Sequence, residues 1–273
     1  MLGKLIKYEF KSTSRVMWFL YGALIVVGAL LGFILRVDDD SFDLSIMPFY
    51  ASSETAQRAL QITLGALGGI YVLMIQAIFI MTIIMIITRF NRNLLGGEGY
   101  LMHTLPVKTH NLILSKGIVA IIWGAIAIAA GILSGLFFSI TSGILGLIIK
   151  ENAWEQIWRS IQEIMGLNTA LFIIAIVIGS IATVLAFYFA MAIGNLANKN
   201  KFLYAVLAYV GIQIVLSIIL SVIGINGGGA TALLIGPGNL RSFLITSIVE
   251  QLILCVGFFF GTNYILKNKL NLA

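Results

Sequence analysis

Residues 59–88 read ALQITLGALGGIYVLMIQAIFIMTIIMIIT and hold no charged side chain. A helix needs about 20 apolar residues to cross the hydrocarbon core of a bilayer. A helix also satisfies its own backbone hydrogen bonds, which the bilayer interior demands. The stretch therefore predicts a membrane span at residues 60–88 and makes lipid, rather than water, the solvent of this chain.

The whole composition agrees with that prediction. Of the 273 residues, 60% are hydrophobic and 10% are charged, whereas soluble domains carry about 25% charged residues. The fold class that we expect is an all-α integral membrane protein with six transmembrane helices, forming a single transmembrane domain over residues 1–273. The other apolar runs predict spans at about residues 16–35, 117–138, 167–193, 202–223 and 242–266.

Three segments outside these spans have patterns of their own. The first 14 residues place apolar side chains on one helical face and lysines on the other, which predicts an amphipathic elbow helix in the membrane interface. No small-residue cleavage site follows, so we expect an uncleaved anchor. Residues 151–165 predict a short amphipathic helix whose two tryptophans favour the interface. The glycine-rich stretch at 224–239 predicts a re-entrant segment before the last span.

The basic residues predict which side each loop faces. Of the 17 Lys and Arg residues, twelve fall on the side of the two termini and of the loop at residues 89–116. The positive-inside rule places that side in the cytoplasm. We therefore expect a multi-pass protein of the cell membrane, a bacterial plasma membrane, with both termini cytoplasmic. The five basic residues on the other side are Arg36, Arg58, Lys150, Arg159 and Arg241.

The residue patterns of several other functions are missing from the sequence. The glycine cluster at residues 96–99 lacks the lysine of a phosphate-binding loop, and no G-x-S-x-G nucleophile elbow occurs. His103 and His110 lack a third nearby ligand, and the only cysteine, Cys255, lies in an apolar run and is expected to be a packed residue. Since basic residues sit at the ends of apolar runs, the formal charge of +6 does not indicate nucleic-acid binding. We expect no catalytic, cofactor or metal site in this chain, and no enzyme activity.

The cytoplasmic loop contains the most informative segment, GGEGYLMHTLPVKTHNLILSK at residues 96–116. Pro106 can break or begin a helix, Leu105 and Val107 offer apolar contacts, and Lys108 and Lys116 remain charged. Such a mixed surface suits docking to another protein. An ordinary solvated turn followed by a helix start accounts for the same composition equally well.

This segment resembles the type 2 permeases of ATP-binding cassette (ABC) transporters, which commonly show a GYL..TLPV....L..SK pattern after the second span. The elbow helix and the six-span layout are similar to that family as well. The resemblance implies that the loop is a coupling helix seated in a separate cassette ATPase subunit, which binds ATP and Mg²⁺, and that two permease chains pair, with a homodimer expected. The matching residues are Gly99, Tyr100, Leu101, Thr104, Leu105, Pro106, Val107, Leu112, Ser115 and Lys116, and the expected coupling contacts are those from Gly99 to Val107 together with Lys108.

Polar residues within the spans suggest where a solute could pass. Glu250 is a candidate functional residue by default, because an ionisable group inside a membrane is costly. The alternative is that Glu250 has no such role and is tolerated because water and Arg241 reach it through the glycine-rich segment. Gln76 and Gln213 could line a pathway or bond across helices. The expected function is the permease of an ABC exporter for an amphipathic or hydrophobic cargo, with peptide export implied by the resemblance.

Three other classes of function stay open. A gradient-driven secondary transporter or a channel would rely on intramembrane ionisable groups such as Glu250. An integral-membrane enzyme would need a polar cluster that the sequence does not show. A purely structural membrane scaffold makes no demand on particular residues, so co-purification with an ATPase would distinguish it from a permease.

Overall fold

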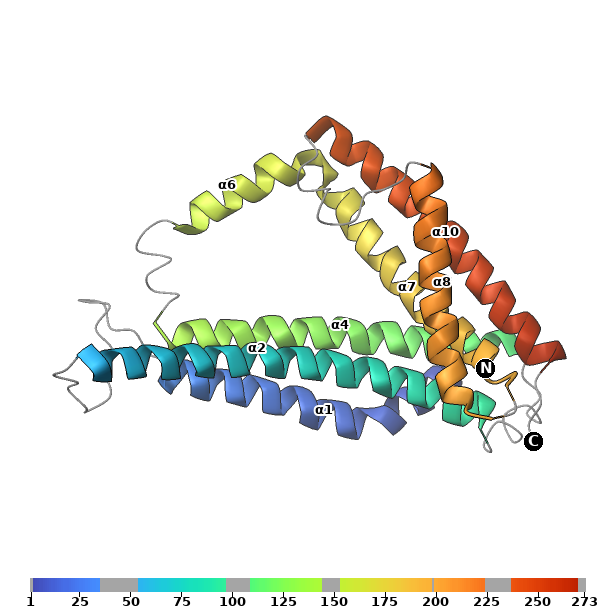
Figure 1. Cartoon of the computed structure of the whole chain (residues 1–273), viewed down its shortest axis with the longest axis horizontal. Helices are drawn as coiled ribbons and strands as arrows, with labels where there is room; N and C mark the ends of the chain where they lie inside the picture. Colours follow the sequence, from blue (N-terminus) through green and yellow to red (C-terminus); the bar gives the residue numbers. More distant parts are fainter. Residues whose placement is uncertain are drawn as a thin grey trace. The chain divides into compact units, whose positions relative to one another are not determined.

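The computed structural model describes residues 2–34, 54–96, 109–143, 153–197, 199–223 and 237–269, and these described residues are helices and short turns with no strand (Figure 1). Six helices are long and apolar enough to cross a membrane, which confirms the expected all-α class with six spans. The elements are α1 (Leu2–Ile34), α2 (Glu54–Phe90), the π-helix η1 (Asn91–Leu95), α4 (Thr109–Thr141), α6 (Ala153–Met165), the 3-10 turn η2 (Gly166–Asn168), α7 (Thr169–Gly194), α8 (Lys201–Ile223) and α10 (Pro237–Asn268).

The surface of these helices is apolar, as lipid contact requires. Phe19, Ile62 and Ile253 expose 81%, 73% and 67% of their area. Many of the buried side chains are small or polar, which is typical of helix packing in membranes, where lipid tails remove the hydrophobic driving force between helices. The buried polar residues include Thr13, Thr82, Ser115, Ser134 and Thr262.

The start of the chain differs from the expected elbow followed by a separate span. Helix α1 runs without interruption from Leu2 to Ile34. The polar stretch around Ser14 lies within this helix, and the Ser14 hydroxyl donates a hydrogen bond of 2.9 Å to the Lys11 carbonyl, which satisfies the hydroxyl inside the helix. An interfacial position for the first 14 residues stays a prediction. The expected re-entrant segment falls mostly on residues 224–236, outside the described residues.

The predicted third span at residues 117–138 lies within α4, which extends beyond it at both ends, from Thr109 to Thr141. Helix α4 ends at Thr141, and Gly143 follows with a φ of 78°, a left-handed conformation that glycine adopts at no steric cost. The expected amphipathic helix at residues 151–165 corresponds to α6, on which Trp154 and Trp158 are both exposed.

The chain forms two compact units, and α1, α2, α4 and α6 contribute residues to both. Unit 1 contains Met1–Phe10, Met85–Ile121 and Ile161–Ala273, and unit 2 contains Lys11–Ile84 and Ile122–Ser160.

Unit 2 is held together by hydrogen bonds between its three long helices. The indole Nε1 of Trp123 donates to Thr13 Oγ1 at 2.8 Å. The hydroxyls of Tyr71 and Ser134 are 2.8 Å apart, and Ser134 Oγ donates to the Leu24 carbonyl at 3.0 Å. Since Ser134 has one hydroxyl hydrogen and gives it to Leu24, Tyr71 is the donor to Ser134. This relay connects α2, α4 and α1.

Unit 1 contains α7 between two partners, α8 and α10. Close approach depends on glycine at two positions. A Cβ at Gly194 of α7 would lie 2.5 Å from the Ala205 backbone nitrogen of α8, and one at Gly261 of α10 would lie 2.5 Å from the Phe189 ring of α7. Helix α7 can therefore pack tightly on both neighbours only while these positions lack side chains.

Candidate functional site

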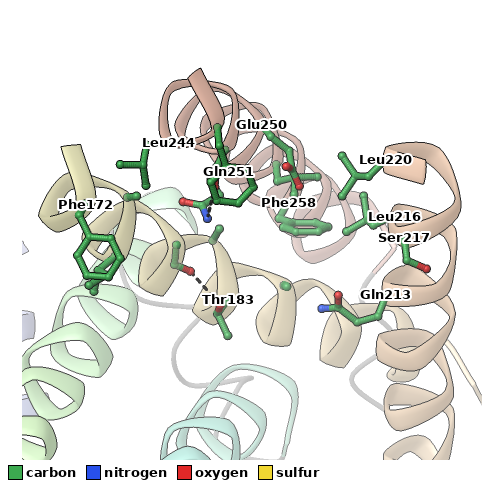
Figure 2. A pocket seen from close by; sticks show the side chains of 18 residues that line it. Phe172, Thr183, Gln213, Leu216, Ser217, Leu220, Leu244, Glu250, Gln251 and Phe258 are labelled. Atoms are coloured by element: carbon green, nitrogen blue, oxygen red, sulfur yellow. Dashed lines mark hydrogen bonds between the residues drawn. The ribbon is translucent and has the colours of Figure 1, made fainter. Parts of the chain in front are cut away.

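A pocket opens among α7, α8 and α10 of unit 1, with a volume of about 520 Å³ (Figure 2). Most of its lining is aliphatic or aromatic, including Phe172, Phe243 and Phe258. Six lining residues carry a polar side chain: Thr183, Gln213, Ser217, Ser247, Glu250 and Gln251. A volume of this size lies within the range of small-molecule sites, about 300–1,000 Å³.

Glu250 supplies the only carboxylate among the described lining residues, and no lysine, arginine or histidine is among them. It lies ten residues past Leu240, where the apolar part of α10 begins. At 1.5 Å per residue it is about 15 Å from that end of the helix. A half-buried carboxylate at such a depth is a candidate for function, because ionisable side chains there are costly to keep.

Gln251 was not among the residues that the sequence singled out, yet it contributes the most confined polar group of the pocket. Its Nε2 lies 3.4 Å from Ser247 Oγ, one turn earlier on α10, whereas its Oε1 is buried with no hydrogen-bond partner in the described part of the chain. Gly179 of α7 makes room for the amide, since a Cβ there would lie 3.2 Å from both amide atoms. The adjacent pair Glu250 and Gln251 within an apolar helix is the sequence signal that could have found it.

Two of the three predicted pathway residues line one pocket. Glu250 and Gln213 line the same pocket, from α10 and α8, and Figure 2 shows the Gln213 amide pointing from α8 toward α7. Gln76 belongs to α2 in unit 2, is exposed, and does not line this pocket. Cys255 lies one turn beyond Gln251 with Sγ 3.9 Å from the Ile178 carbonyl, as expected of a packed residue.

A second polar feature, the Glu9–Lys116–Asn93 cluster, lies in unit 1 beside the predicted coupling loop. The Lys116 ammonium forms an ion pair with the Glu9 carboxylate, and the Asn93 amide donates to the same carboxylate oxygen at 3.3 Å. The side chain of Lys116 is only 4% exposed and that of Glu9 14% exposed. The cluster thus joins the start of α1, the π-helix η1 and the first turns of α4.

An apolar core packs around that cluster. Phe90 at the end of α2 stacks on Tyr188 of α7, with ring centroids 4.0 Å apart and 9° between the ring planes. The π-helix after Phe90 is closed by the Gly96 amide, which donates to the Asn91 carbonyl at 2.8 Å. The buried members of this core are Phe90, Leu94, Leu95, Leu112, Ile113, Tyr188, Met191, Ala205 and Leu266.

The predicted coupling residues Gly99 to Lys108 lie outside the described residues, but the end of their motif is described. Ser115 is buried and its hydroxyl donates to the Leu112 carbonyl at 2.9 Å. Lys116 is the cation of the ion pair with Glu9. Both residues of the SK pair therefore have positions in the packed interior of unit 1.

Other kinds of site find little support in the described part of the chain. No group of three or more His, Cys, Asp or Glu side chains is placed there to hold a metal ion. Comparisons with protein-family models, with curated proteins and with solved structures give no match. The resemblance carried by residues 99–116 therefore stays a prediction from the sequence, and the case for function rests on the geometry of this chain.

Proposed function

We propose that this chain is the permease subunit of an ABC exporter, powered by a separate cassette ATPase that docks on the loop at residues 89–116. Two permease chains pair, as a homodimer, in the plasma membrane with their termini in the cytoplasm. The cargo is amphipathic or hydrophobic, with a peptide favoured. ATP and Mg²⁺ belong to the partner subunit, because this sequence has no phosphate-binding loop.

The observation that supports this proposal best is the buried ion pair of Lys116 with Glu9. If a partner subunit pushes on the loop, the two ends of the loop must move together with the helices to which they are attached. The cluster and the apolar core fix η1, at one end of the loop, and the first turns of α4, at the other end, to the start of α1. Breaking a buried ion pair by removing one partner costs about 3–5 kcal/mol, so this connection resists separation.

The same unit offers a route from the loop to the pocket. The stacked rings of Phe90 and Tyr188 connect the end of α2 to α7, and α7 in turn packs on α8 and α10. All these residues belong to unit 1. Movement of the loop flanks would therefore reach the three pocket helices through direct contacts.

The test is a charge placed on the loop in the presence of the partner. Leu105→Asp should leave the chain inserted in the membrane and remove both ATPase co-purification and cargo-stimulated ATP hydrolysis. The control is Lys199→Asp, at an exposed position in the turn between α7 and α8, which should retain both. Full coupling in the Leu105 variant would refute docking at this loop.

The position of Glu250 in the pocket favours one alternative, a gradient-driven carrier or channel, since such proteins use intramembrane ionisable groups. That alternative predicts proton movement by the purified chain in liposomes without any ATPase. An internal pH-sensitive dye would report it, and Glu250→Gln would abolish it. The exporter proposal predicts no flux above that of empty liposomes, so a flux sensitive to Glu250 would decide for the carrier.

A further inference from the structure

We propose that the pocket among α7, α8 and α10 binds the positively charged end of an amphiphile, an ammonium or guanidinium group attached to an apolar body. The anchoring group is the Glu250 carboxylate. This inference deepens the proposed function by naming the class of cargo. It rests on that function only for the statement that the bound ligand is also the transported cargo. Binding itself requires neither the ATPase nor the loop.

Charge is the first argument. The pocket holds one carboxylate and, among its described lining residues, no cationic side chain. A carboxylate at this depth is stabilised by a positive partner that reaches it. A ligand cation would supply that partner, while a carboxylate or phosphate ligand would be repelled.

The hydrogen-bonding capacity of the pocket gives a second, independent argument. The hydroxyl of Ser217 donates to the Ile214 carbonyl at 2.8 Å, and that of Thr183 donates to the Gly179 carbonyl at 2.8 Å. Each hydroxyl has a single hydrogen, so what remains for a ligand is acceptor capacity. The buried Oε1 of Gln251 is an acceptor with no partner in the described residues. The Glu250 carboxylate is an acceptor as well, so these groups favour a ligand that carries N–H donors, as ammonium and guanidinium groups do, while the Gln213 amide can donate as well as accept.

The remaining lining fits the apolar body of such a ligand. Phe172, Phe243 and Phe258 line the pocket together with aliphatic side chains of all three helices. Aromatic faces also attract a desolvated cation. A volume of about 520 Å³ holds a single end group with its nearest apolar atoms, so a longer cargo would place only its charged end here.

The test compares three probes that share one chain length: octylammonium, octanol and octanoate. The full-length chain is placed in phosphatidylcholine nanodiscs, and binding is measured by equilibrium dialysis against empty nanodiscs, which removes simple partitioning into lipid. We expect saturable binding of octylammonium, at least about tenfold weaker binding of octanol, and none of octanoate. Tenfold is the loss expected when a charge-assisted hydrogen bond disappears.

Variants assign the binding to the pocket. Glu250→Gln should weaken octylammonium binding about tenfold or more, and Gln213→Leu, which alters an exposed side chain, provides a second pocket variant if the first does not fold. Gln76→Leu is the matched control in α2 and should bind as the original chain does. Folding of each variant is checked by its thermal unfolding curve.

Two results would overturn the inference. One is equal binding of octylammonium to the original chain and to folded Glu250→Gln. The other is equal binding of all three probes, which would make the pocket an apolar crevice filled by lipid. Neither result depends on the ATPase, so a failure here is distinct from a failure of the Leu105→Asp experiment, which leaves the pocket intact.

Discussion

Lys116 forms an ion pair with Glu9 across 107 positions of sequence, with both side chains largely shielded from solvent. One partner lies at the start of α1 and the other in the second turn of α4. The pair brings the beginning of the chain to the end of the segment proposed to contact the ATPase. It therefore makes the first turns of α1 part of the structure that supports that segment.

Removal of one charge from this pair should destabilise the protein. Lys116→Met should lower the free energy of unfolding by about 3 kcal/mol or more, because it removes the ammonium that pairs with the largely buried Glu9 carboxylate. Chemical unfolding in mixed detergent micelles measures the change. Lys7→Met, at an exposed position on the same helix as Glu9, should stay within about 0.5 kcal/mol. The double variant Glu9→Leu with Lys116→Met should be less destabilised than the single one, and additive losses would contradict a direct pair.

The close approach of α7 and α8 makes a sharp prediction about glycine. Gly194→Ala should destabilise the protein by about 1–3 kcal/mol, because the added Cβ meets backbone atoms of Ala205, which cannot move without shifting the helix. Gly211→Ala in α8 is the control, since a Cβ there meets nothing within 4 Å. Alanine should even favour the helix by up to about 1 kcal/mol. Equal effects of the two substitutions in thermal unfolding would rule out the tight contact.

The hydrogen-bond relay of unit 2 can be measured by a double-mutant cycle. Tyr71→Phe removes the donor, Ser134→Ala removes the acceptor, and the cycle isolates the interaction between them. Interhelical hydrogen bonds in membranes average about 0.6 kcal/mol, with a maximum near 1.7 kcal/mol. We expect a coupling energy in that range. A value of zero would mean that the two hydroxyls do not bond in the membrane.

The predicted topology can be tested because the chain has a single cysteine. In a Cys255→Ala background, Arg159→Cys on α6 and Lys199→Cys in the turn after α7 both place a thiol at an exposed position. A membrane-impermeant maleimide should label the first in intact cells and the second only after the membrane is opened. The reverse pattern would invert the topology deduced from the basic residues.

The spans could be predicted from sequence because charged residues gather at their ends and the bilayer sets their length. The expected span at residues 167–193 corresponds to α7 at Thr169–Gly194. The continuity of α1 could not be predicted, since a polar stretch such as residues 12–15 permits either a break or a helix. In the structure the stretch is helical, with the Ser14 hydroxyl bonded to the Lys11 carbonyl one turn earlier.

The candidate site was only partly accessible to sequence reasoning. Gln76 and Gln213 are the same residue type in equally apolar helices, and only packing shows that Gln213 lines the pocket. The pairing of Glu9 with Lys116 leaves no local pattern, because the partners belong to helices far apart along the chain. Polar residues inside a span mark candidates, whereas the fold alone determines which of them meet.

The burial of Trp123 gives the molecule an optical reporter of its own. Its indole is 1% exposed, whereas Trp18, Trp154 and Trp158 are each more than half exposed. Replacement of the three exposed indoles by phenylalanine would leave a single tryptophan, bonded to Thr13 and enclosed in unit 2. Its emission wavelength would then follow the packing of that unit during turnover, with no attached dye.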